Sequence, residues 1–205
     1  MLLGRSLHAH ASSSWPDESG PLYAEAIACA ERSGDLHTSL AVHNDAGFHG
    51  LQTGDIPAAR AHLEAALRAA AAVGMPHPLA LGNLAEVMRA EGDRDGARSG
   101  FEEVVRMSRR DGDKWALAGA IFGLGSLAAD LGDWHRAAVL HGAGVALLNQ
   151  IGARLAPSDE FRREEDLNHA RAAIGDEQLQ QAYTHGLALC LDQAIDLALR
   201  KAGSA

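Results

Sequence analysis

The chain has 205 residues and a formal net charge of −9, and 47% of its residues are apolar although only 4% are aromatic. The net negative charge argues against nucleic acid as a direct partner, because contact with phosphates requires a basic surface. No segment approaches the ~18 consecutive apolar residues of a membrane span, and the abundance of Ala, Leu, Val and Gly favours closely packed helices over sheets.

Apolar residues recur through most of the chain at the helical spacing i, i+4, i+7 and i+8. This spacing predicts helices, in chain order, at about residues 2–12, 21–33, 36–53, 56–73, 78–91, 94–110, 114–131 and 134–151. After Gly152 the regular spacing stops, and three further helices are expected near 159–173, 177–188 and 192–201. The predicted fold class is therefore all-α.

Gly-Asp pairs separate the predicted helices at regular intervals. Those that begin at Gly54, Gly92 and Gly132 lie 38 and 40 residues apart, and further pairs begin at Gly34 and Gly112. Glycine adopts the left-handed conformation that ends a helix, and the aspartate that follows can cap the next helix and complement its dipole. Each pair is therefore expected to be the turn between two helices.

The side chains around these turns repeat as well. Seven positions before the Gly of each hairpin turn stands a small residue, namely Gly47, Ala85 or Gly125. Five positions after that Gly stands an alanine, namely Ala59, Ala97 or Ala137. Nine positions after it stands a bulkier residue, namely Leu63, Phe101 or His141. Self-similarity at this period predicts a right-handed solenoid of antiparallel helical hairpins with an irregular helical C-terminal cap. We expect about four units in residues 1–152, the first of them degenerate, and capping helices of the same domain in 153–205.

The turn and the residues five, nine and twelve positions after it resemble the tetratricopeptide repeat, with a period longer than the usual ~34 residues. The segment Trp134–Gly144 (WHRAAVLHGAG), followed by Ile151-Gly152, Pro157 and Gln181–Leu189 (QAYTHGLAL), is similar to the end of the repeat region in large actinobacterial regulators. These are the ATP-binding LuxR-type activators, the SARP-type activators and related predicted ATPases. The resemblance implies the sensor or scaffold part of such a regulator, as a fragment or a stand-alone relative, because no G-x-x-x-x-G-K-[ST] motif occurs.

The first helix of each hairpin is expected to line the concave side of the solenoid, where such repeats bind their partners. Its inner face combines phenylalanine with polar side chains, a composition that recognition surfaces favour. The predicted partner-binding groove comprises Asn44, Phe48, Gln52, Glu86, Arg89, Phe122 and Ser126. The alternative is that the C-terminal helices fold back over this face and bury one of the two phenylalanines.

Other motifs do not predict catalysis, a metal or a cofactor. The G-x-G-x-x-A sequence at Gly123–Ala128 lies within a predicted helix, where a dinucleotide site would need a preceding strand, so we interpret it as helix packing. The eleven histidines lack metal-ligand spacing. His43 and His141 replace Leu or Ile of sister units, so each is either a hydrogen-bonded core histidine or part of a pH or ligand switch.

The sequence therefore predicts a non-catalytic domain that binds a protein or peptide segment, including other domains of the same regulator, or senses a signal. A small-molecule sensor that uses the concave groove is the alternative, and an enzyme is the third hypothesis. No membrane partner is expected. Arg5, His8 and His10 interrupt any signal-peptide core, and the distant Cys29 and Cys190 indicate reduced thiols, so a cytoplasmic location is expected.

Overall fold

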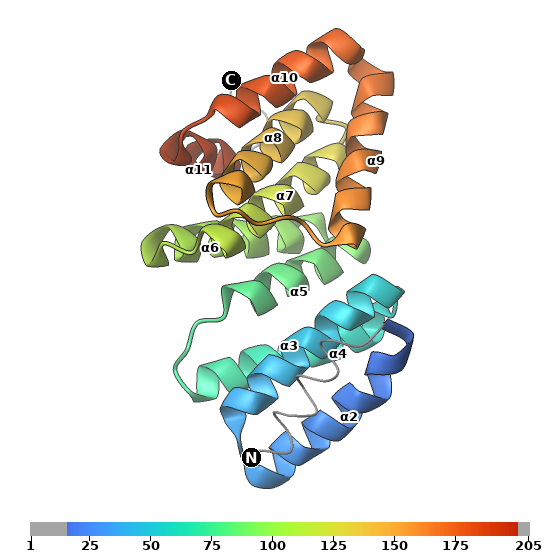
Figure 1. The fold of residues 1–205 in the computed structure, drawn as a ribbon, viewed down its shortest axis with the longest axis vertical. Helices are drawn as coiled ribbons and strands as arrows, with labels where there is room; N and C mark the ends of the chain where they lie inside the picture. Colours follow the sequence, from blue (N-terminus) through green and yellow to red (C-terminus); the bar gives the residue numbers. More distant parts are fainter. Residues whose placement is uncertain (1–15, 201–205) are drawn as a thin grey trace. The chain divides into compact units, whose positions relative to one another are not determined.

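The computed structural model describes residues 16–200, with side chains from Gly20 onward, and within this range it contains ten helices and no strand (Figure 1). The helices are α2 (Pro16–Ser33), α3 (Leu36–Thr53), α4 (Ile56–Ala72), α5 (Pro78–Ala90), α6 (Arg94–Asp111), α7 (Lys114–Asp130), α8 (Trp134–Gln150), α9 (Pro157–Ile174), α10 (Asp176–Ala188) and α11 (Leu191–Leu199).

The prediction of an all-α helical repeat is confirmed. Helix bounds agree with the expected ones to within a few residues, except that α2 begins at Pro16 instead of near residue 21. The helix expected at 2–12 lies outside the described residues. None of the helices in the described range is long and apolar enough to cross a membrane.

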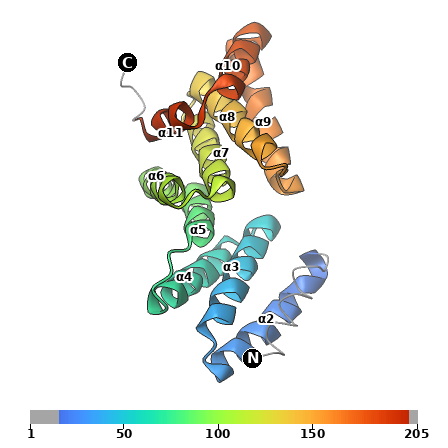
Figure 2. The same ribbon diagram turned by 60° about the vertical axis from the view of Figure 1, so that its left-hand side comes forward.

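The chain forms two compact units, Met1–Asp93 (unit 1) and Arg94–Ala205 (unit 2), which meet in sequence at the turn between α5 and α6. In unit 1, α3 packs against α2, α4 and α5, and α4 also packs against α5. In unit 2, α7 packs between α6 and α8, α9 covers both α7 and α8, α10 packs on α8, and α11 packs on α6 and α8 (Figure 2). The division into repeats at 1–152 and a cap at 153–205 stays a prediction.

The Gly-Asp turns have the conformation that their sequence predicts. Gly54 and Gly132, for example, have φ angles of 78° and 76°, in the left-handed region that glycine enters without a Cβ penalty. At four turns the aspartate carboxylate accepts a hydrogen bond from the backbone N–H three residues later: Asp35 from Thr38, Asp55 from Ala58, Asp113 from Ala116 and Asp133 from Arg136, at 3.0–3.2 Å. One dipeptide thus ends a helix and caps the next.

The predicted register of side chains is confirmed in the α3–α4 and α7–α8 hairpins. The residues five after the turn glycines, Ala59, Ala97 and Ala137, are buried. In the α3–α4 hairpin, a Cβ on Gly47 would lie 2.5 Å from Leu63 Cγ. In the α7–α8 hairpin, a Cβ on Gly125 would lie 3.0 Å from the ring of His141. The small residue seven before the turn therefore makes room for the bulky residue nine after it.

In unit 2 a pair of glycines brings α8 and α10 into backbone contact. A Cβ on Gly186 would overlap the carbonyl oxygen of Val139, and a Cβ on Gly142 would overlap the carbonyl oxygen of Tyr183. Both glycines are buried. Around this contact lies an apolar cluster whose buried members are Ala138, Val139, Ala170, Leu179 and Ala182. The tail of the chain is thus held to the repeat by close packing that leaves no space for a methyl group.

We expect Gly186→Ala to destabilise unit 2 by about 1–3 kcal/mol, because the helices must separate to accept the methyl group. Gly119 of α7 is the matched control, since it is exposed and no neighbouring atom lies within 4 Å of the position of its added Cβ. Gly119→Ala should stabilise the protein by about 0.5–1 kcal/mol through its higher helix propensity. Urea unfolding followed by circular dichroism measures both changes, and equal effects would contradict this packing.

Candidate functional site

The predicted groove residues of unit 1 lie on the two neighbouring helices α3 and α5. On α3, Asn44 and Phe48 are partly buried and Gln52 is exposed. On α5, Arg89 Nε donates to Glu86 Oε2 at 3.0 Å, and these two side chains retain only 15% and 19% of their exposure. All five belong to unit 1, on helices that pack against each other.

A polar contact that the sequence analysis missed links the two helices. Asn83 Nδ2 of α5 donates to Asn44 Oδ1 of α3 at 3.2 Å, and Asn44 Nδ2 donates to Asp45 Oδ1 at 3.1 Å. Asn83 lies three residues before the predicted groove residue Glu86, nearly one helical turn away, and this spacing was the available signal. This hydrogen bond between two side-chain amides joins α3 to α5 close to Phe48, which lies one turn after Asn44 on α3.

The expectation that Phe122 and Ser126 of α7 are exposed is wrong. They retain 8% and 4% of their exposure, on a helix that packs against α6, α8 and α9. The Phe122 ring packs on Gly144 and stacks against the His141 ring at a centroid distance of 6.0 Å. The structure thus buries one of the two phenylalanines, but the contacts of the Phe122 ring lie on α8, the second helix of its own hairpin, whereas Ser126 is the residue that meets α9.

Ser126 takes part in a buried polar network that joins three helices. Ser126 Oγ of α7 donates to Asp166 Oδ2 of α9 at 2.6 Å, and His141 Nε2 of α8 lies 3.1 Å from the same oxygen. His141 retains 1% of its exposure, and its Nδ1 is buried without a hydrogen-bond partner. Because a carboxylate only accepts hydrogen bonds, Nε2 of His141 carries a proton in this arrangement.

The order of this network does not suit nucleophilic catalysis. In a catalytic triad, the histidine lies between the nucleophile and the carboxylate, and takes the proton of the nucleophile. Here Asp166 lies between Ser126 and His141, so the serine proton points to the carboxylate and the imidazole does not reach the serine oxygen. The arrangement is suited to fastening α9 across α7 and α8.

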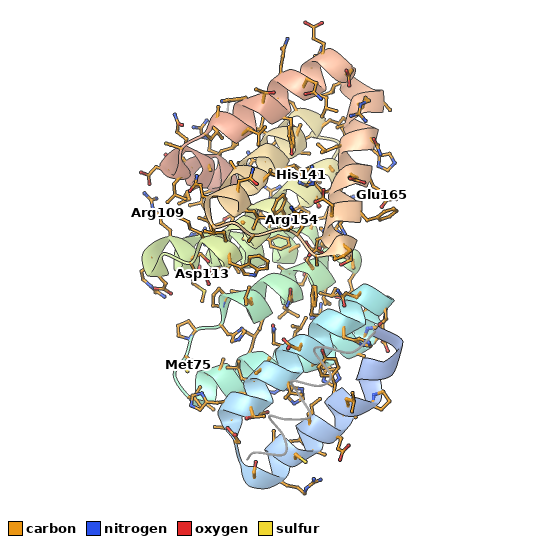
Figure 3. All side chains as sticks on the ribbon, in the orientation of Figure 1. Met75, Arg109, Asp113, His141, Arg154 and Glu165 are labelled. Carbon is orange, nitrogen blue, oxygen red and sulfur yellow. The ribbon has the colours of Figure 1, made fainter. Side chains whose placement is uncertain are left out.

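We expect Asp166→Leu to lower the free energy of unfolding by about 2–4 kcal/mol, because it leaves the buried Ser126 hydroxyl and His141 Nε2 unpaired. Glu165→Leu is the control: the neighbouring Glu165 is exposed and lies on the outer side of α9 (Figure 3). Its replacement should change stability by less than about 0.5 kcal/mol. Denaturant unfolding monitored by circular dichroism distinguishes the two variants, and a small effect of Asp166→Leu would show that the network carries little energy.

The other predicted core histidine pairs with a histidine. His43 Nδ1 of α3 lies 3.1 Å from His62 Nδ1 of α4, so one ring must donate and the other must accept. Burial lowers the pKa of both histidines, and the neighbouring His62 lowers that of His43 further. Glu31 raises the pKa of His43 and Arg68 lowers it, each by less than burial and His62 lower it. The pair therefore requires at least one neutral ring.

Unit 1 should lose stability as the pH falls. The folded pKa values of His43 and His62 lie below the unfolded value of 6.5, so the unfolded chain binds more protons below that pH. The contribution is fully present above about pH 7 and is lost as the pH falls through 6.5 toward the folded values. Amide hydrogen exchange of α3 and α4 measured between pH 7.5 and 5.5, corrected for intrinsic rates, tests this expectation.

The matched variants separate the histidine pair from general acid effects. The double variant His43→Leu/His62→Leu should show a flatter dependence of stability on pH, because both titrating groups are removed. His37→Gln, which alters an exposed histidine of α3, should keep the slope of the parent protein. If the double variant and the parent protein lose stability equally over this pH range, other groups are responsible.

Comparison with known proteins adds no identification. No protein-family model matches the chain, and no curated protein matches it either.

Proposed function

We propose that this chain is a non-catalytic interaction domain that recognises a protein or peptide segment through the face of unit 1 formed by α3 and α5. The observation that carries this proposal is the composition of that face. Phe48 remains partly accessible beside Asn44 and Gln52, and the Glu86–Arg89 pair lies on the adjoining helix. An aromatic anchor among oriented polar groups is typical of recognition surfaces.

The fold supports the same role. The capped α-helices of unit 1 pack against their neighbours in sequence, so the face is presented on rigid elements before a partner arrives. Preformed surfaces lose little conformational entropy on binding. The all-α repeat also agrees with the resemblance to actinobacterial regulators, which further suggests the regulatory part of a bacterial transcriptional regulator or a stand-alone relative, in the cytoplasm.

Site-specific photo-crosslinking in the cell tests the proposal. A photoreactive phenylalanine analogue in place of Phe48 should give a discrete protein adduct, because a partner on this face lies within reach of that side chain. Ala61 of α4, exposed in the same unit, is the control position and should give none. Within the Phe48 derivative, Arg89→Ala should reduce the adduct severalfold while the chain stays folded by circular dichroism.

Two results would overturn the proposal. The first is an adduct of equal yield and size from both positions, which would show nonspecific capture. The second is a discrete adduct that persists unchanged when Arg89 and Asn44 are both replaced by alanine in a folded protein, because the partner would then bind without the polar groups of this face.

A further inference from the structure

Unit 2 contains a pocket that the interaction face of unit 1 does not use. The pocket has a volume of about 340 Å³, and its lining residues come from α8, α9, α10 and the segment that connects α8 to α9. Pockets that hold small molecules start at about 300 Å³. The lining comprises Val145, Leu148, Asn149, Ala153, Arg154, Leu155, Glu160, Arg163 and Tyr183.

The buried network described above helps to position the walls of this pocket. His141, Val145 and Leu148 follow one another at helical spacing along one face of α8, and Arg163 and Asp166 do so on α9. Asp166 fastens α9 to α7 and α8, and Arg163, about one turn earlier on α9, lines the pocket. The walls are thus preformed by contacts that lie outside the pocket.

The charges of the lining leave one cation uncompensated. Glu160 supplies the carboxylate of the lining, and both its oxygens accept from Arg163: Oε2 from Nε at 3.2 Å and Oε1 from Nη2. Arg154, by contrast, has no ion-pair or hydrogen-bond partner among residues 16–200. Figure 3 labels Arg154 on the segment between α8 and α9, where its side chain is exposed at the rim.

Two neutral donors accompany Arg154. Arg163 Nη1 donates to Tyr183 Oη at 3.3 Å, which leaves the phenol proton available for another acceptor. Burial raises the pKa of the Tyr183 phenol, so this proton is retained at neutral pH. Asn149 is exposed and contributes an amide at the same rim. The floor, in contrast, is aliphatic and consists of Val145, Leu148 and Leu155.

We propose that this pocket binds a small carboxylic acid with an aliphatic body, in which the carboxylate meets Arg154 and the Tyr183 hydroxyl and the hydrocarbon covers the floor. The donors match the two oxygens of a carboxylate, and charge-assisted hydrogen bonds of this kind are the strong ones in proteins. A cationic ligand is disfavoured, because the one carboxylate of the lining is already held by Arg163. The site assigns unit 2 a sensing role that is independent of the face on α3 and α5.

The test separates the head of the ligand from its tail. Hexanoate, hexanol and acetate are titrated into the methyl-labelled full-length chain at pH 7.5, and dissociation constants are taken from the shifts of Val145, Leu148 and Leu155 resonances. Hexanoate should bind at least about tenfold more tightly than hexanol, which lacks the charge, and than acetate, which lacks the tail.

Three variants identify the groups responsible. Arg154→Gln removes the charge and should weaken hexanoate about tenfold or more while leaving hexanol unchanged. Tyr183→Phe should weaken hexanoate by a smaller factor. Arg109→Gln, at an exposed arginine of α6 whose partner is Asp192, is the matched control and should bind hexanoate like the parent protein (Figure 3).

The proposal is overturned if hexanol binds as tightly as hexanoate, or if Arg154→Gln and Arg109→Gln have the same affinity for hexanoate. It is also overturned if millimolar hexanoate produces no shifts at the three aliphatic residues. None of these outcomes bears on the α3–α5 face, because that face belongs to unit 1 and has its own crosslinking test.

Discussion

The Gly-Asp turn is the interaction on which the rest of this structure depends. Its glycine ends a helix in the left-handed conformation, and the backbone N–H of the aspartate donates to the carbonyl five residues earlier, as Asp113 does to Ser108 at 3.0 Å and Asp133 to Ala128 at 2.9 Å. The carboxylate of the same aspartate then accepts from the first turn of the next helix. Both ends of a helical connection are thereby satisfied within two residues, which fixes where each helix stops and in which direction its neighbour starts. With that direction set, small and bulky residues at constant distances from the turn meet across the hairpin.

Most of the fold follows from such local chemistry and could therefore be predicted from the sequence. The bounds of α3 were predicted without error because a Gly-Asp pair flanks the helix at each end, and the contact between Gly47 and Leu63 followed from their distances to the turn.

The placement of α9 could not be predicted in this way. Its contacts with α7 and α8 include Asp166, which lies after Gly152, where the repeating register has ended, so the repeat assigns that residue no partner. The sequence also placed Phe122 and Ser126 in an open groove, while the structure buries them, Phe122 against α8 and Ser126 against α9. The pocket depends on the connection between α8 and α9, whose path no periodicity describes.

The two core histidines show how one residue type is accommodated in different ways at apolar positions. His141 stands where the α3–α4 hairpin has Leu63, and its Nε2 is satisfied by the carboxylate of Asp166 on α9, outside the α7–α8 hairpin. His43 is satisfied by His62 within its own hairpin, between two rings that compete for one proton. A buried polar group must find a partner, so each histidine selects a particular neighbour in a way that leucine would not. In unit 2 the partner of His141 comes from α9, which also packs on α7; in unit 1 both rings lie in the α3–α4 contact, which we therefore expect to be sensitive to protonation.

The spacing of the left-handed glycines also limits how this sequence can change in length. Gly34, Gly54, Gly74, Gly92, Gly112, Gly132 and Gly152 recur at intervals of 18 or 20 residues. One residue inserted into a helix would rotate everything beyond it by about 100°, and the small residues would no longer face the bulky ones of the partner helix. Duplication or loss of a complete hairpin, in contrast, preserves every cap and every contact within the hairpins that remain. Descendants of this gene should therefore differ by whole hairpins, with single-residue insertions confined to the irregular connections, residues 73–77 between α4 and α5 and residues 151–156 between α8 and α9.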